Sequence, residues 1–353
     1  MTAVRISTGI RASRNQAIVD IKISLCHLSS MELMLTQLRA CAEPTRLRLL
    51  ALMALGDFCV VELTDILGQS QPRLSRHLRL LVEAGLLERT REGSNAWFSL
   101  AQTGLGRDLA AKLPAIDATL QADRRQAERV LAERARAATE RFRRDGAEWD
   151  EMRALGLPAE TVEAALLADV EMLSLPAGAT LLDIGTGTGR ILELLAPFIG
   201  SGLGIDASRT MLALARSRLS RARLRHCSVR QADMMRLPLP DASFDLTILH
   251  MVLHHSETPG AVITEAARML KPGGTLLIVD LAAHERQDLT RALHHRWPGF
   301  SDADMRRALT SAGLQAMPAA AISGPIDIAI WRATRPAGTT PAAFALEAAS
   351  VHD

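Results

Sequence analysis

Three acids that each follow a short apolar segment have the clearest chemical potential in this sequence. Asp183 begins the glycine-rich segment Asp183–Gly189, Asp206 ends the next apolar segment, and Asp233 ends the one after it. Glycine permits a tight turn in which the backbone approaches a ligand closely. A carboxylate such as Asp206 can accept hydrogen bonds from both hydroxyls of a ribose, and Asp233 is placed to meet the amine of an adenine. The pattern predicts a site for a nucleoside-containing ligand.

A second chemically suggestive segment, residues 70–81, is typical of a helix that reads DNA. Leu74, Leu78 and Leu81 recur on one face at helical spacing, while Ser70 is expected to cap the helix and Pro72 falls in its first turn. No acid lies between Ile66 and Val82. The predicted DNA-binding residues, with the last of them on a following strand, are Ser70, Gln71, Arg73, Ser75, Arg76, His77, Arg79 and Arg91. Gln71 and Arg73 are expected to reach base edges, and Arg76, Arg79 and Arg91 to contact phosphates.

The elements around this helix complete a DNA-binding module. Apolar periodicity predicts helices over Thr45–Leu55 and Val60–Leu67, and Gly68 supplies the tight turn that precedes the basic helix. The segment Leu86–Leu100 reads as two strands around a turn. The order predicts an α+β winged helix-turn-helix over residues 31–110.

The acids at 183, 206 and 233 need a different scaffold. Short apolar segments alternate with amphipathic stretches, which predicts an α/β, Rossmann-like and mostly parallel sheet of seven strands within residues 161–335. The expected strands named from the sequence are Thr180–Ile184, Gly202–Asp206, Leu224–Ala232, Phe244–His250 and Thr275–Asp280.

The two modules are joined by residues 111–160, which include a predicted helix over Gln121–Asp145. Its apolar residues form a narrow seam, namely Ala127, Leu131, Ala138 and Phe142. Two interpretations remain open: a solvated linker held by intrahelical ion pairs, or a helix that stabilises a dimer.

Composition places the chain in the soluble globular class, with 353 residues, 48% hydrophobic and 23% charged. The four cysteines are scattered, so no metal site is expected, and they suit a reducing cytoplasm. No apolar run is long enough for a membrane helix, so no membrane partner is expected. Residues 1–30 are expected to be a disordered extension, or to precede a true start at Met31, with a transit peptide as the less favoured alternative; residues 336–353 read as a disordered tail.

Residues 160–335 resemble a class I S-adenosylmethionine-dependent methyltransferase of the ubiquinone/menaquinone-biosynthesis type. The motifs that carry the resemblance are Leu182–Gly189, Gly204–Asp206, Ala232–Met234, Pro240–Asp245, Leu253–His255 and Arg268–Gly274. It implies that S-adenosylmethionine or S-adenosylhomocysteine is the cofactor, with Asp183 and the glycines at the methionine moiety, Asp206 at the ribose and Asp233 at the adenine. The full set of expected cofactor residues is Asp183, Gly185, Thr186, Gly187, Gly189, Asp206, Ala207, Asp233, Met234 and His250.

The sequence identifies catalytic residues less clearly than cofactor-binding residues. Methyl transfer needs mainly an aligned nucleophile and at most one base, and the candidates are His254, His255 and Asp280. The alternative is structural: the histidines cap a strand end and Asp280 accepts hydrogen bonds from loop N–H groups. We favour this alternative, because analogy of fold does not establish catalysis. The methyl acceptor is not identified by the sequence.

Residues 33–110 resemble the ArsR family of winged-helix repressors, through Glu43–Leu50 and Ser70–Leu78. The resemblance implies a homodimer that binds a double-stranded DNA operator. One metal site of that family uses a Cys-Val-Cys segment. Here Cys59 matches the first cysteine but Val61 stands at the second, so Cys59 is expected to be a core residue.

Three functions are compatible with these features. The first is a transcriptional regulator whose methyltransferase-like domain senses S-adenosylmethionine or S-adenosylhomocysteine. The second is an active methyltransferase of a small molecule that also binds DNA. In the third the winged helix only mediates dimerisation, which the intact basic face disfavours.

Overall fold

The structure is a computed structural model of the chain. It describes residues 30–92, 95–101, 105–114, 116–145, 159–286, 288 and 295–337. The expectations for residues 1–29, for the tail beyond 337 and for the turn at Gly93 and Ser94 lie outside the described residues. Among the described residues, no helix combines the length and the apolarity that crossing a bilayer requires. The chain divides after Glu128 into two compact units, each described by itself.

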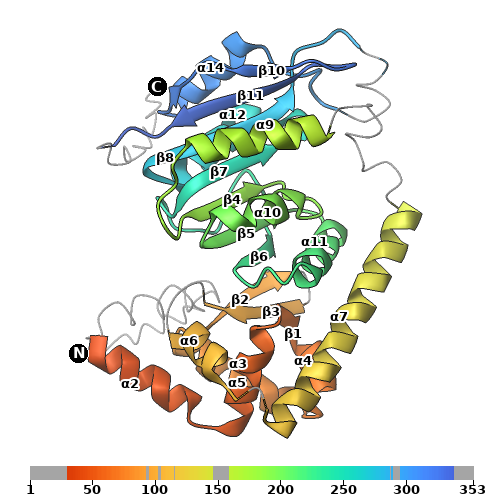
Figure 1. Ribbon diagram of the computed structural model, residues 1–353, viewed down its shortest axis with the longest axis vertical. Helices are drawn as coiled ribbons and strands as arrows, with labels where there is room; N and C mark the ends of the chain where they lie inside the picture. The colour runs from red at the N-terminus through yellow and green to blue at the C-terminus, as the bar shows by residue number, and fades with distance from the viewer. Residues whose placement is uncertain are drawn as a thin grey trace, which may run out of the picture. The chain divides into compact units, whose positions relative to one another are not determined.

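The N-terminal unit packs helices around a small antiparallel sheet (Figure 1). Its strands lie in the order β1-β3-β2, and β2 and β3 form the wing that follows α5. The wing therefore follows the basic helix, as predicted. The elements are α2 (Ser30–Cys41), α3 (Pro44–Met53), β1 (Phe58–Cys59), α4 (Val60–Leu67), α5 (Gln71–Glu83), β2 (Leu87–Glu92), β3 (Asn95–Leu100), α6 (Leu105–Lys112) and α7 (Ala118–Asp145), which continues past the unit boundary.

Helix α5 begins at the predicted position. Ser70 has extended backbone angles at the N-cap, and Pro72 lies in the first turn. The Ser70 side chain makes no capping hydrogen bond, so the prediction that its hydroxyl caps the helix is wrong. The fixed φ of Pro72 favours the start of the helix instead. Leu74, Leu78 and Leu81 are fully buried. The apolar stripe of α5 thus faces the core, and its polar face is left outside.

An ion pair fastens the first part of α7 to α3. Nε of Arg48 donates to Oδ2 of Asp123 at 2.6 Å, and Nη2 donates to Oδ1 at 2.7 Å. The Asp123 side chain is only 6% exposed, against 22% for Arg48. Ala127 of the predicted seam is buried and Leu131 is half-buried, while the side chains of Ala138 and Phe142 lie outside the described residues. The start of α7 is therefore part of the N-terminal unit.

The C-terminal unit contains a mixed sheet in which parallel pairing predominates. Neighbours among β6, β5, β4, β7 and β8 pair in parallel, while β11 pairs antiparallel with β8, and β10 and β9 pair antiparallel with β11. The path β10-β11-β8-β7-β4-β5-β6 has the seven strands expected, and β9 adds an eighth beside it. The bounds are β4 (Thr180–Ile184), β5 (Ser201–Asp206), β6 (Cys227–Gln231), β7 (Phe244–His250), β8 (Leu270–Leu281), β9 (Gln315–Ala316), β10 (Ala320–Ile322) and β11 (Ile328–Thr334).

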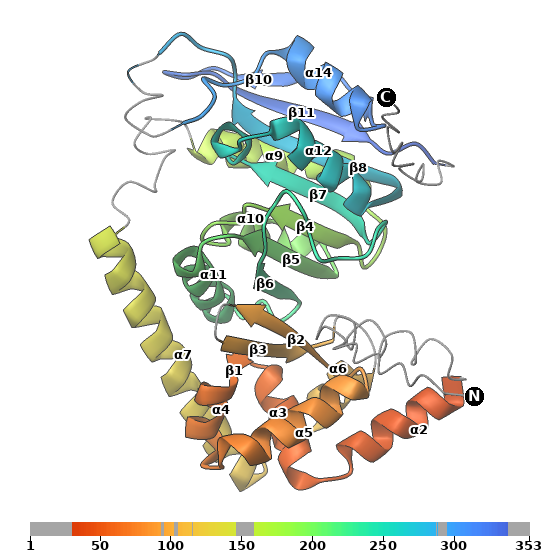
Figure 2. The ribbon, with the colours of Figure 1, turned by 180° about the vertical axis from the view of Figure 1, so that it is seen from behind.

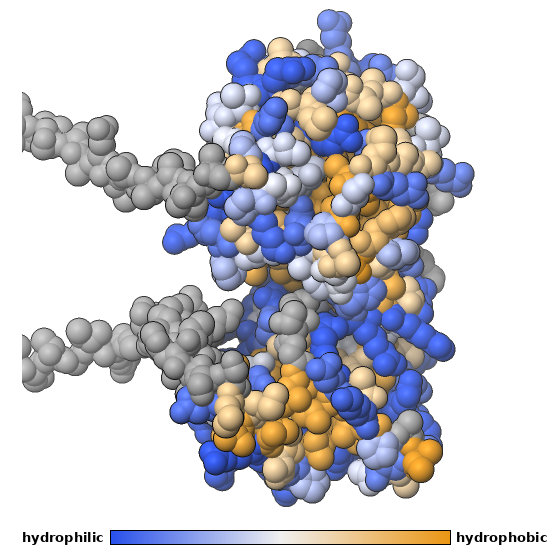
Figure 3. Space-filling view, turned by 60° about the vertical axis from the view of Figure 1, so that its left-hand side comes forward, coloured by the Kyte–Doolittle hydropathy of each residue, from blue (hydrophilic) through white to orange (hydrophobic). Residues whose placement is uncertain are grey.

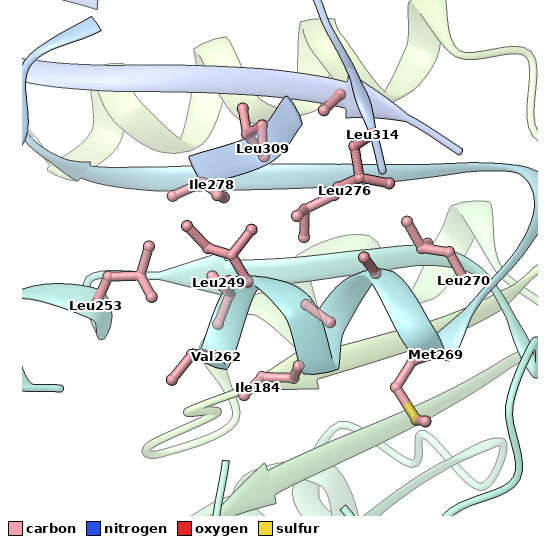
Figure 4. Packing of buried hydrophobic residues seen from close by; sticks show 14 of the residues in the cluster. Ile184, Leu249, Leu253, Val262, Met269, Leu270, Leu276, Ile278, Leu309 and Leu314 are labelled. Atoms are coloured by element: carbon pink, nitrogen blue, oxygen red, sulfur yellow. The ribbon is translucent and has the colours of Figure 1, made fainter. Parts of the chain in front are cut away.

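Helices cover both faces of this sheet (Figures 1 and 2). Leu166 of α9, Ile191 of α10 and Leu212 of α11 belong to one hydrophobic cluster, which lies on one face. Val262 of α12 and Leu309 of α14 belong to the cluster on the other (Figure 4). The unit is therefore a three-layer α/β fold. The helical bounds are α9 (Ala159–Met172), α10 (Arg190–Leu195), η1 (Ala196–Phe198), α11 (Arg209–Arg221), η2 (Leu253–His255), α12 (Pro259–Met269) and α14 (Asp302–Ser311).

Strand order reverses at β4, which pairs with β5 on one side and with β7 on the other. In open α/β sheets, ligands bind beyond the carboxyl ends of the strands at such a reversal. The segment after β4 is the glycine-rich turn, so the fold places that turn where a ligand is expected.

Most predicted strand bounds agree with the structure, and the differences have local causes. β6 begins at Cys227 rather than Leu224, because Leu224 donates its N–H to the carbonyl of Leu219 and belongs to the turn that ends α11. β8 begins at Leu270, earlier than the expected Thr275. The segments that form β9, β10 and β11 are not among those named as strands from the sequence.

We expect Arg48→Ala to lower the stability of the chain by about 3 kcal/mol at neutral pH, because it leaves the buried Asp123 carboxylate without its partner. Arg124 is a matched control on α7, since its pair with Glu128 is exposed on both sides. Arg124→Ala should cost under about 1 kcal/mol. Scanning calorimetry of both variants measures the difference, and equal shifts in the transition would show that the Arg48 pair does not fasten α7.

Candidate functional site

The glycine-rich turn after β4 has the backbone that its composition predicts. Gly185, Gly187 and Gly189 have φ of 77°, 51° and 77°. A Cβ on Gly185 would lie 2.4 Å from Cγ2 of Val252, whereas a Cβ on Gly187 would meet nothing within 4 Å. Close packing therefore requires Gly185, and Gly187 leaves open space in which a ligand can approach the backbone.

Asp183 is a fully buried acid beneath this turn. Its Oδ2 accepts a hydrogen bond from Oγ1 of Thr186 at 2.6 Å, and its Oδ1 has no hydrogen-bond partner among the described residues. Thr186 packs on Gly204, where a Cβ would lie 2.6 Å from Oγ1. Burial raises the pKa of Asp183 to about 7, the Thr186 hydroxyl opposes the rise, and the charge of Asp206 adds to it. A buried acid with an unsatisfied oxygen is a candidate to receive a donor or cation from a ligand.

Asp206, at the end of β5, joins the turn to the next helix. Its Oδ2 accepts the N–H of Gly187 at 2.9 Å, and its Oδ1 accepts the N–H of Ser208 at 2.7 Å. Burial raises the pKa of this carboxyl, and the two N–H groups lower it. Each carboxylate oxygen retains a second lone pair for a ligand hydroxyl. The hydrogen bond from Gly187 to Asp206 could not be predicted from the sequence, because it depends on the parallel register of β4 and β5.

The other expected cofactor residues lie at the same edge of the sheet. Ala207 and Asp233 are exposed, and Oδ1 of Asp233 accepts the N–H two residues further on at 2.9 Å. Met234 is half-buried. His250 ends β7 with its Nε2 buried and without a hydrogen-bond partner among the described residues. Burial lowers the pKa of His250 to about 4, so its imidazole is neutral at pH 7.

The catalytic candidates form a buried arrangement beside this edge. Nδ1 of His254 lies 2.6 Å from Oδ1 of Asp280, and both side chains are almost fully buried. The Asp280 carboxylate also accepts the N–H groups of Leu253 at 2.9 Å and Leu281 at 2.8 Å. His255 is half-buried, and its ring centroid lies 4.2 Å from that of His254. Asp280 thus accepts backbone N–H groups, as in the structural alternative, and it also orients the His254 imidazole, which that alternative did not include.

All but one of the predicted DNA-binding residues are exposed in the N-terminal unit. The exposed residues are Ser70, Gln71, Arg73, Ser75, Arg76, Arg79 and, on the wing, Arg91. His77 differs, because its side chain is only 13% exposed and its Nδ1 lies 3.5 Å from Oε2 of Glu43. The geometry therefore favours packing against the start of α3 for His77 over the expected contact with DNA.

Cys59 has the surroundings of a core residue. It is 8% exposed, and its backbone N–H donates to Oε2 of Glu62 at 2.8 Å as part of the cap of α4. Val61 is 57% exposed and provides no ligand atom. The described helix therefore lacks the second thiolate that a Cys-Val-Cys site requires.

Known protein families match segments in both units of the chain. Residues 182–278 match the family model of the methyltransferase domain, and residues 43–89 match that of the bacterial regulatory proteins of the ArsR family. One segment of the chain thus matches an ArsR-family helix-turn-helix, and another matches a methyltransferase domain. The match to the methyltransferase domain implies S-adenosylmethionine or S-adenosylhomocysteine as its cofactor.

The similarity to curated proteins lies in part of the chain. It is 32% identical over 114 residues to an uncharacterized methyltransferase, YcgJ, of Bacillus subtilis, covering 32% of this chain and 45% of that protein. It is 35% identical over 120 residues to a demethylmenaquinone methyltransferase of Tropheryma whipplei, covering 34% and 48%. It is 35% identical over 119 residues to an arsenite methyltransferase of Aquipseudomonas alcaligenes, covering 31% and 34%. The chain spans less than half the length of these relatives.

Among solved structures, the crystal structure of YcgJ from Bacillus subtilis superposes on half of this chain. The TM-score is 0.44 at 18% sequence identity, and the match covers 50% of this chain and all of that one.

The raised pKa of Asp183 predicts a pH-dependent affinity for S-adenosylhomocysteine. Without ligand, the folded protein holds a proton on Asp183 up to about pH 7. A ligand ammonium near the turn favours the carboxylate, so binding releases that proton, and affinity should rise with pH up to about pH 7, by at most about tenfold per pH unit, and level off above that pH. Calorimetric titration of Asp183→Asn should give a flatter profile. Glu160→Gln, an exposed acid on α9, should keep the wild-type slope, and a pH-independent wild type would contradict the prediction.

Proposed function

We propose that the protein is a transcriptional regulator that binds operator DNA through α5 and the wing, and that S-adenosylmethionine or S-adenosylhomocysteine in the methyltransferase domain is its effector. One observation carries the proposal: a single chain holds both an exposed arginine face on a helix-turn-helix and a glycine turn with buried acids at a sheet reversal. A protein with this role acts where the DNA is, in the bacterial cytoplasm.

The DNA-binding half rests on the polar face of α5. Arg73, Arg76 and Arg79 are exposed, and the only partner recorded for them among the described residues is Glu83, at 3.9 Å from Arg79 in an exposed pair. Arginine side chains suit both guanine edges and phosphates. Arg73 lies near the start of the helix, the end that enters the major groove in helix-turn-helix proteins.

A homodimer is part of the proposal, and α2 is the surface that supports it. Met31 is 73% exposed and Met34 55%, and Leu35 and Leu38 are each 44% exposed. Figure 3, turned toward this side, shows hydrophobic residues gathered on the N-terminal unit. A helix that leaves such a stripe in solvent is expected to pack against another surface, and a second copy supplies a stripe of the same kind. Symmetric operators are read by such dimers.

The ligand-binding half rests on the turn and its acids. The space beside Gly187 admits a ligand, Asp206 has lone pairs left for ribose hydroxyls, and Asp233 is exposed at the adjoining strand end. The unsatisfied Oδ1 of Asp183 suits the ammonium of the methionine moiety, directly or through water.

The choice of a sensor over an enzyme rests on the candidate bases. His254 is fully buried and held by Asp280, and the imidazole of His250 is neutral and buried at Nε2. A base must come within hydrogen-bond reach of the proton it removes, and neither of these two imidazoles presents itself to a substrate in this arrangement. The remaining candidate, His255, is half-buried, and its ring lies against that of His254. The domain can still bind its cofactor, which is all that a sensor requires. The alternative remains a methyltransferase of a small molecule that also binds DNA.

Substitutions on α5 test the DNA-binding half. Arg73→Ala should reduce discrimination between random duplex and a duplex selected from a random pool by the wild-type chain, because Arg73 is assigned to bases. Arg79→Ala should weaken both similarly and reduce the slope of log affinity against log salt by about 1.

Mobility shifts at several salt concentrations measure both effects, with Arg124→Ala on α7 as a matched surface control that should behave as wild type. Equal losses from Arg73→Ala and Arg79→Ala on both duplexes would refute the assignment.

Effector binding tests the regulator proposal as a whole. Saturating S-adenosylhomocysteine or S-adenosylmethionine should change affinity for the selected duplex by about 5- to 150-fold, the usual range of allosteric coupling. Asp206→Asn, which replaces one ribose acceptor by a donor, should weaken ligand binding and shift the response to higher ligand concentration. If neither ligand changes DNA affinity, the two-activity enzyme becomes the better account.

A further inference from the structure

Three histidine side chains lie close together near the carboxyl ends of the parallel strands, and their spacing in the sequence does not reveal this. Two come from η2, His254 and His255, and the third is His295, which precedes Trp297. Their ring centroids are 4.2 Å apart for the first two, 4.4 Å for His254 and His295, and 5.3 Å for His255 and His295. A nitrogen of each ring lies within 4.8 Å of a nitrogen of the others. Three side chains of the usual metal-binding type therefore converge on one point.

A carboxylate orients the central imidazole of this group. Oδ1 of Asp280 lies 2.6 Å from Nδ1 of His254, which places the proton on Nδ1 and leaves the lone pair on Nε2. The same carboxylate is fixed by the backbone N–H groups of Leu253 and Leu281. Histidines that bind metals nearly always donate their other N–H to a carboxylate or carbonyl in this way. The outer-sphere partner of one of the three histidines is thus already in place.

The backbone also holds the third histidine in place. The N–H groups of Arg296 and Trp297 both donate to the carbonyl of His254, at 2.9 and 3.2 Å. The indole Nε1 of Trp297 donates to the carbonyl of Ser256 at 2.9 Å. These bonds join the segment that carries His295 to the segment that carries His254 and His255. Convergence of the three rings therefore depends on backbone contacts and not on the rings alone.

We propose that His254, His255 and His295 bind a divalent transition-metal ion of the zinc type, with Asp280 orienting His254. Imidazole is a ligand for zinc, copper, iron and nickel, and three histidines with one open position form a known kind of zinc site. Tetrahedral zinc with bonds of about 2.0 to 2.1 Å needs nitrogens about 3.3 to 3.4 Å apart. The ring nitrogens lie within 4.8 Å of one another, so the rings must move closer together when the ion binds, and the fourth position is left for water or an anionic ligand.

The proposal does not depend on DNA binding or on the choice between sensor and enzyme. It places a metal two residues beyond Val252, whose side chain packs against the glycine turn at Gly185. An ion bound there would link η2, which follows β7, to the segment that carries His295, and would restrict the movement of both segments.

Metal binding by the untagged full-length chain tests this site. Chelator-treated protein should bind one Zn²⁺ per chain, and one Co²⁺ should give the intense visible absorption bands of a tetrahedral site. His295→Ala should abolish the cobalt bands and weaken zinc binding strongly, and His255→Gln should do the same. Asp280→Asn should weaken zinc binding by about 10- to 100-fold, the effect of losing an outer-sphere partner. Competition with a coloured chelator measures the affinities.

His226→Gln is the matched control, since His226 lies in the same domain and bonds the carbonyl of Ala196 instead. It should bind zinc as the wild type does. Circular dichroism checks folding, and His255→Gln, which alters the least buried of the three rings, decides the matter if His295→Ala does not fold. A wild-type chain that binds no zinc, or zinc binding that is equal in the wild type, His255→Gln and His295→Ala, would overturn the proposal and assign any bound metal elsewhere.

Discussion

Parallel pairing of β4 with both β5 and β7 is the constraint on which the ligand end of the methyltransferase domain depends. Because these strands run in the same direction, their carboxyl ends meet at one edge, and the residues that follow each strand become neighbours. Asp183, Asp206 and His250 come together for this reason alone. The same edge, extended by β8, adds Asp280 and the η2 histidines. One topological feature thus brings together the acids of the proposed cofactor site and two of the three clustered histidines.

Burying the carboxylates of Asp183 and Asp206 at this edge costs free energy, which nearby hydrogen bonds partly offset. Asp183 lies with one oxygen on Thr186 and the other without a partner among the described residues, and Asp206 uses two backbone N–H groups to stay compatible with its surroundings. A ligand with hydroxyl and ammonium donors supplies what is missing. In the proposed site, a ligand that stabilises these carboxylates would also stabilise the turn they hold. Such a ligand can act as an effector without undergoing any reaction.

Local rules in the sequence were sufficient for much of this arrangement. Helical spacing of leucines predicted the buried face of α5, and alternation of apolar and amphipathic segments predicted the parallel strands. Contacts between distant segments were beyond such rules: Arg48 and Asp123 are 75 positions apart, and His295 meets His254 only because backbone bonds join their segments. His77 is a further case, because its Nδ1 lies 3.5 Å from Glu43, the N-cap residue of α3, which helical spacing within α5 does not reveal. The spacing of side chains along the sequence identifies the buried face of a helix, whereas the residues that a side chain contacts depend on the tertiary fold.

Coupling between cofactor and DNA is the central claim, and thermodynamic linkage makes it testable from the cofactor side. Calorimetric titration of the full-length chain with S-adenosylhomocysteine should be carried out alone and with saturating operator duplex. If the two sites are coupled, DNA must change the affinity for the cofactor by the same factor by which the cofactor changes the affinity for DNA. A change of about 5- to 150-fold is the predicted result. An affinity for S-adenosylhomocysteine that is the same with and without bound operator would contradict the regulator proposal.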